Sequence, residues 1–151
     1  MSSSRKKEST SRSAAKSLKQ NSAIAKLTKL GDKPTALPAK SLEVFPNPQS
    51  RRDFLIHMQI PEFTCLCPKT GQPDFATLYL DYIPDRACVE LKSLKLYLWS
   101  FRNDGIFYER AVNRILDDLV AACRPKHIKV VGDFNVRGGL KSIITAQWTR
   151  P

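Results

Sequence analysis

The loop TCLCPKTGQPDF, residues 64–75, carries the side chains best suited to covalent chemistry. Cys67 precedes Pro68 where a first strand ends, and Asp74 lies at the start of the next strand. Because the ends of a hairpin loop meet, we expect the thiol and the carboxyl to converge. Together they would supply a nucleophile and a partner for proton transfer. Spacing alone leaves an alternative, in which Cys67 is a small buried hydrophobic residue.

A second group of candidate residues lies in the segment ELKSLKLY, residues 90–97. Lys92 and Lys95 are three positions apart and share one face of a predicted helix, with Ser93 near its start. Cations and free N–H groups at a helix N-terminus favour phosphate, although a solvated basic face is the alternative. Glu109 begins the next predicted helix, where the macrodipole favours a carboxylate even without a ligand.

Hydrophobic periodicity indicates the elements that position these residues. The pattern predicts strands over 54–60, 75–83, 127–134 and 140–148, helices over 91–101 and 107–123, a loop over 61–74, and a candidate extension of the sheet at 87–90. The strands are grouped rather than alternating with helices. This order predicts an α+β fold with an antiparallel sheet.

The charge of the chain is concentrated at its start. Ten of the 25 Lys and Arg residues fall in residues 1–40 against Glu8 and Asp32, and this segment carries +8 of the net +11. Residues 1–22 are rich in Ser, Lys and Arg and have too few large apolar residues to fold. We therefore expect a disordered basic tail over 1–25 and one domain over 26–151. The nearly balanced domain argues against direct tRNA binding.

Several protein classes do not fit the sequence. No run approaches the ~18 consecutive apolar residues of a spanning helix, so we expect no membrane association. A secretory signal is not apparent, which favours a cytoplasmic protein with free thiols. Cys65 and Cys67 lack the spacing of a zinc knuckle, and His57 and His127 stand alone, so no metal site is predicted.

Two motifs at matching separation identify a family resemblance. The loop TCLCPKTGQPDF and the segment VELKSLKLYLWSFRN closely resemble the NADPH-dependent 7-cyano-7-deazaguanine reductases of tRNA queuosine biosynthesis. The segments 101–103, 107–109 and 137–139 also fit, and the resemblance runs from about Leu27 to Arg150. It implies the tunnelling fold, a four-stranded antiparallel sheet with two helices on one face. It also implies homo-oligomeric β-barrel rings, here a decamer of two pentamers.

The resemblance implies a reaction and a role for each candidate residue. Cys67 would attack the nitrile of 7-cyano-7-deazaguanine to form a covalent thioimide, with Asp74 as its proton partner. Hydrides from two NADPH would then give 7-aminomethyl-7-deazaguanine. By the same resemblance, the remaining residues fall into a substrate-binding set (Val89, Glu90, Leu91, Tyr108 and Glu109) and an NADPH phosphate-binding set (Lys92, Ser93, Lys95 and Arg137).

This chain departs from the family pattern at two positions. Tyr108 stands where the family commonly has His, and Cys65 is an extra thiol two residues before the nucleophile. Two other functions are alternatives. A GTP cyclohydrolase of the same fold would need a His and Cys metal set, which His57 and His127 do not form. An RNA-binding module would rely on the basic tail and on Lys92 and Lys95.

Overall fold

The computed structural model describes residues 37–151, and the basic tail predicted over 1–25 lies outside the described residues. The elements are β1 Val44–Pro46, β2 Ile56–Leu66, β3 Pro73–Ile83, β4 Ala87–Val89, α2 Leu91–Trp99, the 3₁₀ turn η1 Ser100–Asn103, α3 Tyr108–Cys123, β5 His127–Arg137 and β6 Leu140–Thr149. The predicted order of two strands, two helices and two strands is confirmed for the long elements.

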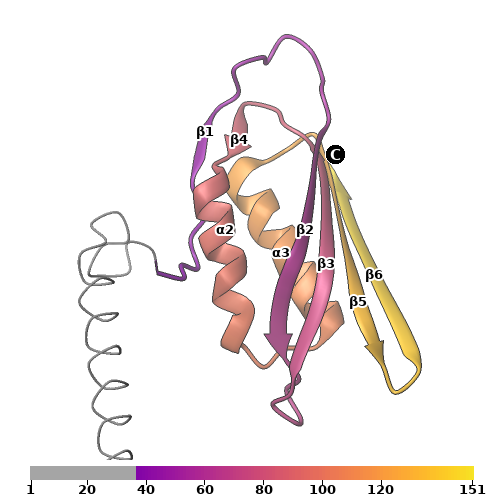
Figure 1. Cartoon of the computed structure of the whole chain (residues 1–151). Helices are drawn as coiled ribbons and strands as arrows, with labels where there is room; N and C mark the ends of the chain where they lie inside the picture. Colours follow the sequence, from indigo (N-terminus) through magenta and orange to yellow (C-terminus); the bar gives the residue numbers. More distant parts are fainter. Residues whose placement is uncertain (1–36) are drawn as a thin grey trace, which may run out of the picture. The chain divides into compact units, whose positions relative to one another are not determined.

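Four long strands form one antiparallel sheet in the order β2-β3-β5-β6. Helices α2 and α3 lie together on one side of this sheet, as Figure 1 shows. Alternate residues of each strand face the helices, which produces the alternating burial along β3 and β5. The α+β class and the antiparallel sheet with two helices on one face are therefore confirmed.

The helices follow the apolar spacing of the sequence. Helix α3 buries one face, including Val112, Ile115 and Leu119, against β5 and β6. Gly132 of β5 allows this approach, because an added Cβ would lie 2.7 Å from Val112 Cγ2. Helix α2 ends earlier than predicted, and its last residues continue as the tighter turn η1.

Two predictions of secondary structure were wrong. Residues 61–74 are not all loop, since β2 continues to Leu66 and β3 begins at Pro73. A register shift between Ile60 and Phe63 accommodates Pro61 on an edge strand, where a missing N–H costs no ladder hydrogen bond. The segment 87–90 does not extend the main sheet either. Instead, β4 pairs with β1 in a separate two-stranded sheet.

Candidate active site

A cavity of about 270 Å³ lies beside the loop that joins β2 to β3. The side chains around it come from that loop, from the start of α3 and from the end of β5. Its lining residues are Cys67, Pro68, Asp74, Ile106, Phe107, Tyr108, Glu109 and Arg137. The fold thus brings together five residues that the sequence singled out, from segments up to 70 positions apart.

The β2–β3 loop holds Cys67 in a closed turn. The Cys67 backbone N–H donates to the Gln72 carbonyl at 2.8 Å, and the Gly71 N–H donates to the Cys67 carbonyl at 2.9 Å. Gly71 has φ +68°, a conformation that favours glycine. Hydrogen bonds from the Thr70 side chain and from the Lys69 and Thr70 backbone lower the pKa of the Cys67 thiol. The loop therefore favours the nucleophilic thiolate.

Cys65, the neighbouring thiol, has a different environment. It is fully buried on the helix-facing side of β2 and belongs to the hydrophobic core. Burial raises its pKa to about 11, so it stays protonated near neutral pH. A buried, protonated thiol of this kind is expected to be unreactive.

Asp74 is the buried carboxylate of the cavity, with 3% of its surface exposed. Its Oδ1 accepts a hydrogen bond from the Tyr108 hydroxyl at 2.8 Å and forms an ion pair with Arg137 Nη1. Arg137 Nη2 also donates to Gln72 Oε1 at 2.6 Å. Tyr108 of α3 and Arg137 of β5 therefore orient the carboxylate. Arg137 also contacts the loop that carries Cys67.

The start of α3 contributes two neighbouring residues. Tyr108 stacks on Phe134 of β5, with ring centroids 3.8 Å apart and planes 9° apart. Burial, and then the hydrogen bond to Asp74, raise the Tyr108 pKa. Glu109 is exposed in the first turn of α3 and lines the cavity. The pair thus offers one half-buried hydroxyl and one exposed carboxylate.

Sequence reasoning missed three residues of this site. Thr70 and Gln72 were part of the loop but were given no role, and Phe134 was assigned only to a strand. Hydroxyl and amide side chains next to a candidate nucleophile are a signal that could have pointed to the first two. The stacking of Phe134 on Tyr108 depends on strand register and carries no local signal.

The remaining predicted residues gather around the start of α2. Glu90 caps this helix, accepting from the Lys92 N–H at 2.9 Å and the Ser93 N–H at 2.6 Å, which lowers the Glu90 pKa. Val89 and Ser93 are buried, and the Ser93 hydroxyl bonds within the chain to Glu43 and Glu90. Leu91 is exposed, as are Lys92 and Lys95.

These two groups of residues lie at opposite ends of the sheet. Asp74 is near the start of β3, whereas Val89 N–H donates to the hydroxyl of Tyr82, near the end of the same strand. Eight residues of extended strand span about 26 Å. Figure 1 shows the β2–β3 loop at one end and β4 with the start of α2 at the other. A single copy of the chain therefore does not bring the two groups together.

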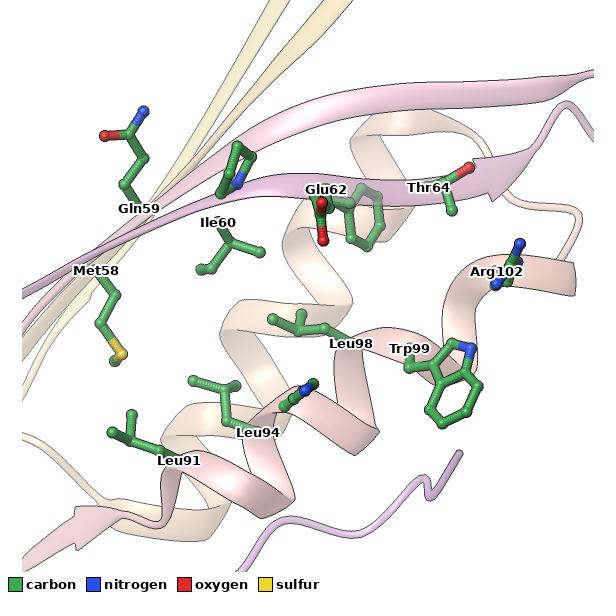
Figure 2. Close-up of a pocket in the computed structure, with 13 residues that line it drawn as sticks. Met58, Gln59, Ile60, Glu62, Thr64, Leu91, Leu94, Leu98, Trp99 and Arg102 are labelled. Atoms are coloured by element: carbon green, nitrogen blue, oxygen red, sulfur yellow. The ribbon is translucent and has the colours of Figure 1, made fainter. Parts of the chain in front are cut away.

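A larger groove of about 530 Å³ lies between β2 and α2. Figure 2 shows Leu94 and Leu98 of α2 and Met58 and Ile60 of β2 lining it, with Trp99 and Arg102 at one end. Lys95 also lines this groove. The candidate phosphate-binding residue thus borders an apolar surface beside the edge strand β2.

The two histidines lie apart from the cavity in the described part of the chain. His57 Nδ1 contacts Asp81 at 2.5 Å, and His127 Nδ1 contacts Thr149 at 2.8 Å. Each histidine therefore pairs with a side chain on a neighbouring strand. Within residues 37–151, no group of three His, Cys, Asp or Glu side chains is arranged to hold a metal ion. Over the same residues, every helix is too short or too polar to cross a bilayer.

Comparisons with known proteins agree on one family. The family model described as QueF-like protein matches residues 73–151. An NADPH-dependent 7-cyano-7-deazaguanine reductase of Alkalilimnicola ehrlichii is 62% identical over 76% of this chain and 88% of its own length. Its namesake in Thiobacillus denitrificans is 66% identical over 73% of this chain and 79% of its own length.

A solved structure supports the fold separately. The apo archaeosine synthase QueF-Like superposes with a TM-score of 0.58 over 62% of this chain and 91% of its own, at 22% identity. This likeness concerns the fold alone. The matched family model and the relatives above 60% identity show that the chain belongs to the QueF-like family, alongside the NADPH-dependent 7-cyano-7-deazaguanine reductases.

Proposed function

We propose that this chain reduces the nitrile of 7-cyano-7-deazaguanine to the primary amine of 7-aminomethyl-7-deazaguanine, with NADPH as reductant. The observation that carries the proposal is the cavity shared by Cys67, Asp74 and Glu109. It offers a nucleophile, a proton carrier and a hydrogen-bond acceptor in one place. The names of the curated relatives, which state NADPH and this substrate, support the assignment.

The first chemical step is covalent. The Cys67 thiolate adds to the nitrile carbon, forming an S–C bond while one C≡N electron pair moves to nitrogen. The proton lost by the thiol passes through Asp74 to that nitrogen, giving a thioimide with no leaving group and no reductant consumed. The lowered pKa of Cys67 supports this step, because it increases the thiolate fraction near neutral pH.

Reduction then requires a bound dinucleotide. When bound, NADPH would supply one hydride per molecule, so two molecules would be needed in turn: one for the thioimide carbon and one for the imine that follows release of the thiol. Lys92 and Lys95 are exposed cations that fit its phosphates. The Ser93 hydroxyl is already bonded inside the chain, so the lysines are the stronger candidates of this group. Cys67 takes back a proton when the C–S bond breaks.

Glu109 is the proposed specificity residue. Its exposed carboxylate at the cavity would accept hydrogen bonds from the ring N–H and the exocyclic amine of the deazaguanine. A bound base would cover this carboxylate, and a base without these donors would leave it unpaired, which costs binding free energy. This two-point contact would therefore reject bases that lack the donors.

A second copy of the chain is needed to complete the site. Val89, Glu90, Leu91, Lys92 and Lys95 lie in the segment that runs from the end of β4 into α2, and this segment begins at the far end of the sheet from Cys67. In the described part of the chain, β2 and β6 are edge strands with unpaired backbone groups. Pairing of these edges between copies would close a β-barrel ring and bring the α2 start of one copy to the cavity of its neighbour. A decamer of two pentamers is the proposed assembly.

Intact mass spectrometry tests the proposal directly. The full chain is mixed with 7-cyano-7-deazaguanine without NADPH, alongside the variants Cys67→Ala and Asp74→Asn. We expect a mass gain equal to that of the nitrile in the wild type, none in Cys67→Ala and slow formation in Asp74→Asn. NADPH should then discharge the adduct. A folded wild type that forms no adduct would contradict the proposal.

A further inference from the structure

Among residues 37–151, the side-chain contacts that hold Asp74 reach only one of its two oxygens. The Tyr108 hydroxyl and the Arg137 guanidinium both bond to Oδ1, and neither bonds to Oδ2. The carboxylate is almost fully buried, so its orientation is set by these contacts rather than by water. Oδ2 is therefore the oxygen available to carry a proton within the cavity.

Arg137 connects this carboxylate to the nucleophile loop. One guanidinium nitrogen, Nη1, pairs with Asp74, and the other, Nη2, donates to the Gln72 side chain. The Gln72 carbonyl in turn accepts from the Cys67 N–H. A planar guanidinium can make both contacts at once, whereas a lysine ammonium lacks this fixed fork. The contacts form a continuous connection from Asp74 through Arg137 and Gln72 to Cys67.

We propose that Arg137, oriented by Gln72, is a positioning residue that sets Asp74 relative to the Cys67 thiol for covalent addition. The inference rests on the proposed function and differs from the role that the family resemblance implies for Arg137. A cofactor phosphate would compete for the same two nitrogens, and both are already bonded within the chain. The thioimide step distinguishes the two roles, because it proceeds without NADPH.

The test measures the rate of adduct formation with 7-cyano-7-deazaguanine alone, and separately the KM for NADPH in turnover. Arg137→Gln should form the adduct about 10- to 100-fold more slowly than the wild type, as expected when a reacting group is misplaced. Arg137→Lys should remain slow, because it keeps the charge but not the fork. Gln72→Ala should slow the same step by a smaller factor. The Gln72 side chain is exposed, so we expect this variant to fold.

Arg150→Gln is the matched control. Arg150 also pairs with a carboxylate, Asp85, and its side chain is 41% exposed against 38% for Arg137. It should leave the adduct rate unchanged. The inference is overturned if Arg137→Gln and Gln72→Ala both form the adduct within twofold of the wild-type rate, even if the KM for NADPH rises. Absence of the adduct in the wild type would instead refute the proposed function.

Discussion

The Tyr108 ring stacks on the Phe134 ring with their planes 9° apart, and this contact directs the Tyr108 hydroxyl at Asp74 Oδ1. The stack joins the first residue of α3 to β5. A phenol held in this way keeps a hydroxyl–carboxylate contact at the position where the family resemblance implies a His. A Tyr at this position thus still supplies a hydrogen-bond donor to Asp74.

Tyr108→Phe tests that contact. The variant keeps the stacked ring but loses one of the two bonds to Oδ1, worth about 1 kcal/mol. We expect adduct formation to slow by about three- to tenfold, since Arg137 still holds the carboxylate. Tyr79→Phe, which alters a tyrosine of β3, is the control for loss of a phenol hydroxyl. Equal rates in all three proteins would argue against a role for the hydroxyl.

Thr70→Val should reduce the reactivity of Cys67. The Thr70 side chain is the largest contributor to the lowered pKa of this thiol, so its removal should raise that pKa. The iodoacetamide alkylation rate, measured against pH, should then reach half its maximum at a higher pH than in the wild type. Thr70→Ser, which retains the hydroxyl, should behave like the wild type. An unshifted profile for Thr70→Val would contradict the assigned cause.

Glu90→Ala should lower stability in a pH-dependent way. Hydrogen bonds from the Lys92 and Ser93 backbone lower the folded-state pKa of Glu90. The stabilisation is therefore present above the ordinary Glu pKa and is lost as the pH falls through the lowered folded value. The Tm difference from the wild type should be clear at neutral pH and should disappear in strong acid. Glu62→Ala, on β2, serves as the control; a difference independent of pH would refute the capping role of the charge.

Gly132→Ala should destabilise the packing of α3 on the sheet. The added Cβ would lie 2.7 Å from Val112 Cγ2 and 2.9 Å from Phe134 Cε2. Overpacking of this kind costs about 1–3 kcal/mol, which urea unfolding would measure. Because Val112→Ala removes the clashing methyl, the double variant should lose less than the sum of the two single variants. Additive losses would show that Val112 is not the source of strain.

The sequence predicted the fold class and the element order because the periodicity of β3 and α3 is strong. The secondary-structure prediction was wrong where a local residue type pointed to the wrong element. Pro61 suggested a loop, but an edge strand with a bulge tolerates proline, and the short β4 found its partner in β1. The convergence of Cys67 and Asp74 followed from hairpin geometry. The contacts of Arg137 could not be predicted from the sequence, because they depend on the register of β5 against β3.

The placement of two groups of predicted residues at opposite ends of the sheet has a genetic consequence. If each site draws Cys67 from one subunit and Lys92 from its neighbour, two different inactive variants can complement each other. Cys67→Ala mixed with a variant lacking Lys92 and Lys95 would restore about a quarter of the sites upon random co-assembly. Each subunit would then depend on its neighbour's sequence, and a single defective allele could impair sites to which an intact copy also contributes.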